Sequence, residues 1–299
     1  MDYYIDCEFL EGKQKESFPI SLFRKKTPNT IDLISIGIVE EDTDAFSKRI
    51  GKTDKTYRGR EYYAISKDFN LKEAWNRYQI EKDFGKPQGL GDKKVYWIRD
   101  NVLKPIFLEL CERDSIFATG EKDYFTFKRF KRLLNKYGKT NKQIAEEIKE
   151  FCKHGVLGID EFAPNTLWPG GQLITRDKPE FYAYYADYDW VVFCWLFGKM
   201  IDLPRGFPML AFDIQQLIYD NNIDKNELLK DVPQLNCHNS LEDALWNKNA
   251  HEWINKKINE KKRKGNYRTH GKGIIEQIEK VESYNKLSKE QELKLKKKQ

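Results

Sequence analysis

The first ten residues, MDYYIDCEFL, contain two carboxylates at a spacing that could bind a metal ion. Tyr, Ile, Phe and Cys favour a β-strand, and strand alternation would place Asp6 and Glu8 side by side on one face. Acidic residues are disfavoured in strands, and neighbouring like charges repel unless a cation lies between them. A divalent metal would resolve this conflict. On this stretch alone, an edge strand with a solvated face is the simpler interpretation.

Three further residues with metal-binding or acid–base chemistry stand near predicted helix starts. Asp189 begins a strongly apolar helix, where an acidic residue is also a common N-cap, and its neighbour Asp187 is a rival for any functional role. Asp243 follows Ser240 by three, a spacing that also fits a helix capping box. His238 stands just before that helix. Its imidazole and the carboxylate of Asp243 could therefore point into one cleft.

The elements that must position these residues begin with three strands in succession, at 1–10, 31–39 and 61–66. The absence of an intervening helix predicts an antiparallel meander. Long loops are predicted at 11–29 and 81–94, and a further loop after residue 221. The remaining predicted elements are helices at 71–80, 97–109, 121–137 and 142–151, a strand at 180–186, a helix at 187–200 that is apolar on nearly every side and so buried, a helix near 213–221, and a long helix from Ser240.

This order predicts one α/β domain in which the first strand is central to the sheet. The meander would lie on one side of that strand and a parallel strand on the other. In α/β folds, ligands bind beyond the carboxyl ends of the strands. The acidic residues near strand ends and helix starts are therefore candidates to meet at one sheet edge.

The composition describes a polar globular protein of 299 residues, with 39% hydrophobic and 33% charged residues. No run approaches the ~20 apolar residues of a membrane span, and no secretory signal opens the chain. Five cysteines without a CxxC pair argue against a disulfide framework and a zinc knuckle. These features favour a cytoplasmic protein without a membrane partner.

The net charge of +6 is concentrated at the end of the chain. Residues 256–299 contain 15 Lys and Arg against 6 Glu, whereas the rest contains 38 basic against 41 acidic residues. Such a tail is either a solvated or disordered end or a segment that captures nucleic acid. The basic helix around residues 128–132 could likewise track a phosphate backbone or present a solvated face.

Taken in order, these motifs resemble the DEDDh 3′–5′ exonucleases of the ribonuclease H-like superfamily. That family has DxE on its first strand, a mid-chain Asp, and HxxxxD near the end of the domain. The resemblance is closest to the RNase AS-type, polyadenylate-specific 3′-exoribonucleases. The resembling stretches are YYIDCEFLEG, IDLISIGIVEED followed by REYYAIS, NKQIAEEIKEF, YYADYDWVVFCWLFG and HNSLEDA. They cover most of residues 1–255, with insertions near 11–29, 41–60, 76–94 and 108–138, and leave 256–299 as a basic, partly helical or disordered tail.

The resemblance implies a ribonuclease H-like mixed sheet flanked by helices, with two Mg²⁺ or Mn²⁺ ions in each site. It implies that Asp6 bridges both ions and that Glu8 and Asp243 complete one ion site. Asp189 would hold the other ion, possessing the aromatic neighbours that the family pattern has around this Asp. His238 would be the general base that takes a proton from the attacking water.

The implied activity is 3′–5′ exonucleolytic cleavage of single-stranded RNA that releases nucleoside monophosphates, with adenylate-rich 3′ ends as a candidate preference. Phe9 and Leu10 are candidates to contact the terminal base, although Phe9 also suits the core. The resemblance suggests a homodimer. A DNA-directed 3′–5′ exonuclease and a non-catalytic nucleic-acid-binding scaffold are the alternatives, because the carboxylates do not distinguish RNA from DNA.

Overall fold

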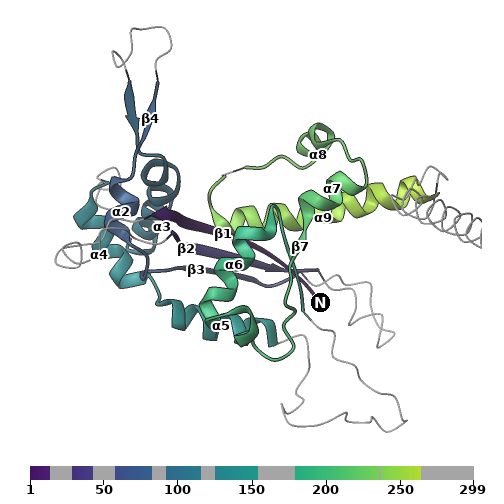
Figure 1. The fold of residues 1–299 in the computed structure, drawn as a ribbon, viewed down its shortest axis with the longest axis horizontal. Coiled ribbons are helices and arrows are strands. Elements are labelled where there is room, and N and C mark those ends of the chain that lie inside the picture. The colour runs from purple at the N-terminus through teal and green to yellow at the C-terminus, as the bar shows by residue number, and fades with distance from the viewer. Residues whose placement is uncertain are drawn as a thin grey trace, which may run out of the picture.

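A computed structural model describes most of the chain as one mixed sheet with helices packed around it (Figure 1). Predictions for most of the 11–29 and 41–60 insertions, and for the tail beyond residue 263, lie outside the described residues. The described residues are 1–13, 29–42, 58–82, 92–115, 125–153, 179–235 and 237–263.

The main sheet has five strands in the order β3-β2-β1-β6-β7. Strand β1 (Asp2–Lys13) pairs antiparallel with β2 (Asn29–Glu40), and β2 pairs antiparallel with β3 (Glu61–Ile65). On its other side β1 pairs parallel with β6 (Glu180–Ala183), which pairs parallel with β7 (Phe212–Asp213). The predicted meander, the central first strand and the parallel neighbour are therefore confirmed, and the fold class is α/β.

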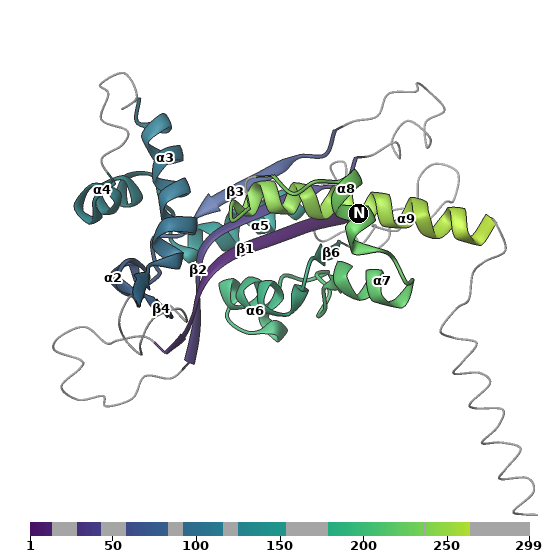
Figure 2. The same ribbon diagram turned by 90° about the horizontal axis from the view of Figure 1, so that it is seen from above.

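Helices cover both faces of this sheet and one of its ends (Figures 1 and 2). Helices α5 and α6 pack on one face, and α9 with α7 and α8 on the other. Helices α2, α3 and α4 form a third cluster at one end. The bounds are α2 Leu71–Asn76, η2 Arg99–Leu103, α3 Lys104–Arg113, α4 Phe127–Tyr137, α5 Asn141–Lys153, α6 Ala186–Phe197, η4 Met200–Asp202, α7 Ile214–Asp220, α8 Lys225–Asp231 and α9 Ser240–Arg263.

Alternation along β1 assigns its side chains to the two faces. Tyr3, Ile5 and Cys7 are buried against α5 and α6. Tyr4 is buried on the opposite side, in the cluster that includes α9. Asp6 and Glu8 continue the alternation that begins at Tyr4. The first strand therefore carries an apolar face and an acidic face, as predicted.

The predicted helix at 71–80 is too long, and the predicted loop at 81–94 contains a strand. Helix α2 ends at Asn76, because Arg77 is extended and its guanidinium donates hydrogen bonds to the carbonyls of Glu11 and Lys13 at the end of β1. The chain then forms a hairpin of β4 (Gln79–Glu81) and β5 (Lys93–Val95). A tertiary contact therefore overrides the local helical pattern.

Helix α6 is only partly buried, which corrects the prediction that its apolar sequence is buried on nearly every side. Phe193 is fully buried, whereas Tyr188, Val191 and Trp195 are exposed along one stripe. An almost uniformly apolar helix has no polar residues to mark its outer face.

Helix α8 occupies part of the predicted loop after residue 221. The Asp224 side chain caps this helix by accepting a hydrogen bond from the amide of Asn226, and Leu228 anchors it in the core. One buried residue in a seven-residue helix is too weak a periodic signal to predict. Among the described residues, no helix has the length and apolar character needed to cross a bilayer.

Helix α9 begins in direct contact with β2, because Gly37 has no side chain to separate them. A Cβ atom at Gly37 would lie 2.1 Å from the carbonyl oxygen of Ser240 and 2.5 Å from the Cα of Leu241. The Ser240 hydroxyl lies 3.1 Å from that of Ser35 and completes the contact. The first turn of α9, which contains Asp243, is consequently held against the sheet.

We expect Gly37→Ala to destabilise the protein by about 1–3 kcal/mol, because the added methyl group meets backbone atoms rather than a movable side chain. Urea unfolding followed by circular dichroism would measure the change. An unfolding free energy equal to that of the wild type would show that α9 can move away from β2 at no cost.

Candidate active site

Three carboxylates converge where β1 meets the first turn of α9. One oxygen from each of Asp6, Glu8 and Asp243 lies within 4.8 Å of the others. Asp243 is buried, and the two strand residues are partly buried. This all-oxygen donor set suits hard divalent cations such as Mg²⁺ and Mn²⁺. The structure thus brings together three of the residues that the sequence singled out.

The Asp243 carboxylate is held by hydrogen bonds from residues that precede α9. It does not form a capping box with Ser240. It accepts hydrogen bonds from the backbone N–H of His238 at 2.8 Å and from the Gln234 side-chain amide at 2.6 Å. Asn239 is the residue that caps α9, since its side-chain oxygen accepts hydrogen bonds from two amides of the first turn. Asp243 is therefore free of the capping role and points toward β1.

Asp189 approaches the same strand from α6, at an edge where β1 lacks a neighbouring strand. Strand β6 pairs with β1 only along Asp2–Tyr4, and the N–H of Cys7 donates to Asp189 Oδ1 at 2.7 Å. The side chain of Asn247 on α9 donates to the carbonyl of Ile5 at 2.9 Å. Side chains from two helices thus replace a strand along this open edge.

The helix position of Asp189 excludes the alternative N-cap role. The N-cap residue of α6 is Tyr185, and Asp189 lies inside the first turns of the helix. Asp189 is buried against β1, whereas the rival Asp187 is exposed. Of these two residues, the geometry connects Asp189 with the acidic strand.

Burial and mutual repulsion raise the pKa values of the clustered carboxyl groups. Burial raises the pKa of Asp6 well above its usual range, and the charges of Asp189, Asp243 and Glu8 raise it further. Burial is also the main cause of the raised pKa values of Asp189, Glu8 and Asp243. Ionising all four carboxyl groups at the same time therefore costs free energy, and a bound cation would offset that cost.

His238 stands beside the carboxylates and is held from several directions. Its Nδ1 lies 3.6 Å from Glu8 Oε1, and hydrogen bonding to Glu8 raises the pKa of the imidazole. Its ring meets the indole of Trp97 edge to face, with centroids 4.7 Å apart. The backbone of His238 has a φ of 71°, in the left-handed region. The imidazole is partly exposed, so a water molecule can reach it.

Trp97 is a neighbour of the site that no sequence motif marks. The sequence pattern predicts only that it begins a helix, whereas the residue is 40% exposed and its indole lies against His238. The available signal was the run YWIR next to a polar loop, because exposed aromatic and basic residues together are typical of nucleic-acid contacts.

The two candidates for base contact lie in different environments. Leu10 is completely buried in the cluster formed with α2, α3 and α4, so its side chain has no exposed surface to offer a base. Phe9 is partly buried, and its ring lies 5.8 Å from that of the exposed Tyr188. A register shift in β1 between Glu8 and Phe9 separates the acidic part of the strand from these residues. Burial favours a core role for Leu10, and Phe9 keeps an accessible surface.

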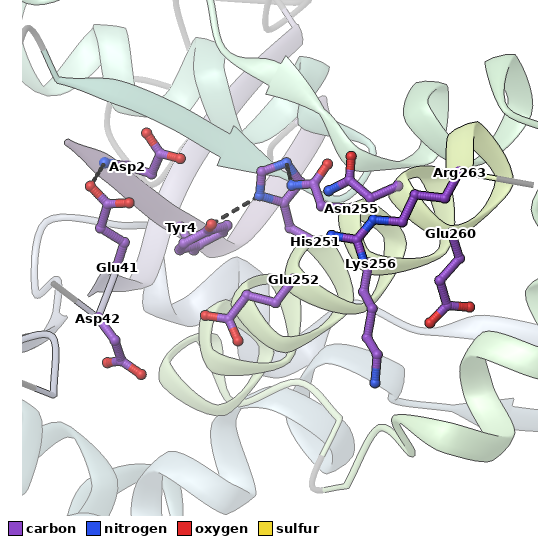
Figure 3. A pocket seen from close by; sticks show the side chains of 11 residues that line it. Asp2, Tyr4, Glu41, Asp42, His251, Glu252, Asn255, Lys256, Glu260 and Arg263 are labelled. Atoms are coloured by element: carbon purple, nitrogen blue, oxygen red, sulfur yellow. Dashed lines mark hydrogen bonds between the residues drawn. The ribbon is translucent and has the colours of Figure 1, made fainter. Parts of the chain in front are cut away.

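A separate cavity of about 560 Å³ lies at the beginning of β1 (Figure 3). The hydroxyl of Tyr4 lies 2.9 Å from Nδ1 of His251, and burial lowers the pKa of this histidine to about 4. Carboxylates outnumber cations around this cavity, so it is poorly suited to a polyanion. Its lining residues are Asp2, Tyr4, Glu41, Asp42, His251, Glu252, Asn255, Lys256, Asn259, Glu260 and Arg263.

Comparison with known proteins finds distant relatives among exoribonucleases. No protein-family model matches the chain. The chain is 24% identical over 220 residues to the 3′-5′ exoribonuclease Rv2179c of Mycobacterium tuberculosis and to its counterpart MT2234.1 from another strain of that species. In both cases the similarity covers 74% of this chain and 75% of the relative. The chain is thus distantly similar to 3′–5′ exoribonucleases.

We expect Asp6→Asn to stabilise the metal-free protein by about 0.5–2 kcal/mol, because it removes one of four repelling charges at the candidate site. Mn²⁺ or Mg²⁺ should raise the melting temperature of the wild type and leave that of Asp6→Asn almost unchanged. Thermal unfolding in chelator and in each metal would measure both effects. Equal metal-induced shifts in the two proteins would contradict a metal site at Asp6.

The stability difference between these two proteins should also depend on pH. A carboxyl group whose pKa is raised by folding destabilises the folded state; this cost is complete above the raised pKa and is lost progressively as the pH falls toward the pKa of the unfolded chain. In chelator, the advantage of Asp6→Asn should therefore be largest at alkaline pH and shrink as the pH falls toward the ordinary pKa of an aspartate. A constant difference across this range would show that Asp6 is not destabilised by its surroundings.

Proposed function

We propose that this protein is a metal-dependent 3′–5′ exoribonuclease that releases nucleoside monophosphates from single-stranded RNA. One observation carries the proposal, namely that the carboxylates of Asp6, Glu8, Asp189 and Asp243 gather with His238 at one sheet edge. The distant similarity to 3′–5′ exoribonucleases supports the same reaction class. The substrate and the direction of cleavage come from that similarity and from the resemblance in the motifs.

In the proposed mechanism, the carboxylates would hold two Mg²⁺ or Mn²⁺ ions. Asp6, Glu8 and Asp243 would hold one ion, and Asp189 together with Asp6 the other. Two-ion sites neutralise the charge that develops on a phosphate during hydrolysis. The accessible imidazole of His238 would take the proton of the attacking water, and Glu8 would orient that ring. The amide of Cys7 and the amide of His238 would hold Asp189 and Asp243 in place.

The alternatives differ from this proposal in substrate or in activity. A DNA-directed 3′–5′ exonuclease would use the same carboxylates and lack contacts to the 2′-hydroxyl group. A non-catalytic scaffold would not need four carboxylates and a histidine at one edge. A preference for adenylate and the homodimer remain predictions, and light scattering would test the latter.

The direct test is degradation of 5′-labelled 20-nucleotide substrates in Mg²⁺, Mn²⁺ or chelator. Poly(A), the other homopolymer RNAs and single-stranded DNA should be compared. A metal-dependent ladder that shortens from the 3′ end is expected with RNA, and the ranking of substrates assigns the specificity. An intact substrate in both metals would contradict the enzymatic proposal, and faster cleavage of DNA would favour the DNA-directed alternative.

We expect His238→Ala to lower kcat by about 10²–10⁴-fold, the contribution typical of a general base. The metal-induced rise in melting temperature should persist, because His238 is not among the metal-binding carboxylates. Single-turnover kinetics and thermal unfolding would measure these two effects. Wild-type turnover in His238→Ala would exclude the imidazole as the base.

The neighbouring acidic residues of α6 offer a matched pair of variants. Asp189→Asn should lower activity by about 10²-fold or more, because it weakens the second ion site next to β1. Asp187→Asn should leave activity close to that of the wild type, because Asp187 is exposed. A comparison of kcat at saturating metal and RNA would measure both variants. The opposite ranking would identify Asp187 as the functional residue.

A further inference from the structure

The β4–β5 hairpin carries aromatic and basic side chains that the proposed chemistry does not use. The hairpin projects from the helical end of the molecule, clear of the five-stranded sheet (Figure 1). Ile80 on β4 faces Lys94 on β5, and alternation places Tyr78 and Tyr96 on the same side as this pair. Tyr78 is 45% exposed and Ile80 is 49% exposed. One face of the hairpin is therefore apolar, aromatic and open to solvent.

Cations and aromatic rings alternate along this face. Lys94 Nζ lies 4.4 Å from the ring centroid of Tyr78, and Arg99 Cζ lies 3.9 Å from that of Tyr96. The rings of Tyr78 and Tyr96 are 5.9 Å apart. Neither tyrosine belongs to the three core clusters of the described residues. These side chains thus contact one another and are not required to fill the core.

The same chain segment leads to the candidate active site. Tyr96 is followed by Trp97, whose exposed indole meets the ring of His238. We define Tyr78, Lys94, Tyr96, Trp97 and Arg99 as the hairpin ladder. The ladder begins beside the proposed general base and continues away from the sheet along the hairpin.

We propose that the hairpin ladder binds the unpaired nucleotides that precede the 3′-terminal nucleotide of the substrate. Exposed rings stack on bases without requiring a particular sequence, and the adjacent cations attract phosphates. This chemistry fits a single-stranded nucleic acid better than an apolar protein segment, because Tyr78 and Tyr96 are each accompanied by a cation. The ladder would hold the strand while its terminal phosphodiester lies at the carboxylates. This inference rests on the proposed nuclease function.

The double variant Tyr78→Ala/Lys94→Ala removes one ring and one cation far along the hairpin. For this variant and for the wild type, kcat/KM should be measured on a 20-nucleotide RNA and on a trinucleotide. The kcat/KM for the 20-nucleotide RNA divided by that for the trinucleotide should be about 5- to 150-fold lower in the variant than in the wild type, which is the size of one lost stacking contact. The salt dependence of binding should also decrease, because one phosphate contact is lost.

A matched control is Tyr219→Ala/Lys230→Ala, which removes an exposed ring and an exposed cation on α7 and α8, away from the hairpin (Figure 1). It should leave the ratio unchanged. Thermal unfolding of both double variants would confirm that each remains folded.

Binding of the fluorescently labelled 20-nucleotide RNA in chelator, measured by anisotropy, separates the two proposals. Weaker binding by the hairpin variant alone, together with the lower ratio, supports the ladder. If the wild type binds but cleaves neither substrate, the nuclease proposal fails and the binding data still test the ladder. Equal binding and equal ratios in the hairpin variant and the wild type would overturn the ladder, and would leave its face available to a protein partner.

Discussion

The repulsion among four carboxylates at the open edge of β1 is the constraint on which the rest of the structure depends. Burial and the neighbouring charges both disfavour the ionised forms. The fold nevertheless holds these groups together with contacts that do not involve a metal. Asp189 and Asp243 each accept a hydrogen bond from a backbone N–H group, and Gly37 allows α9 to lie directly on the sheet. Apolar packing on both faces therefore supports an arrangement that the charges alone would oppose.

The sequence predicts those features that depend on local periodicity. Alternation identifies the acidic face of β1, and the order of strands and helices predicts the central position of β1 in the sheet. Other features depend on contacts between distant segments. Arg77 ends α2 by binding the end of β1, and Asp189, not Asp187, accepts a hydrogen bond from that strand. The contact of Arg77 has no signal in the local sequence, whereas the aromatic neighbours of Asp189 favour it only through the family resemblance.

The proposed site and its surroundings divide opposite charges between different parts of the molecule. The carboxylates occupy the centre, where they suit cations and repel a phosphate chain. Lys94 stands on the hairpin and Arg99 at the start of η2, and Trp97 between them contacts His238. A polyanionic substrate would thus meet favourable charge before it reaches the acidic cluster. The acidic cavity at the other end of β1 offers no comparable approach.

The short pairing between β1 and β6 has a consequence for the behaviour of the protein at high concentration. Beyond Tyr4, this side of β1 is a strand edge, and such edges can recruit strands from other molecules and start aggregation. Here the backbone N–H of Cys7 donates a hydrogen bond to the carboxylate of Asp189, and the side-chain amide of Asn247 donates one to the carbonyl of Ile5. An incoming strand would have to displace both and bring its own carbonyl oxygens next to buried negative charge. The side chains of Asp189 and Asn247 that cover this edge therefore keep it from pairing with the edges of other molecules.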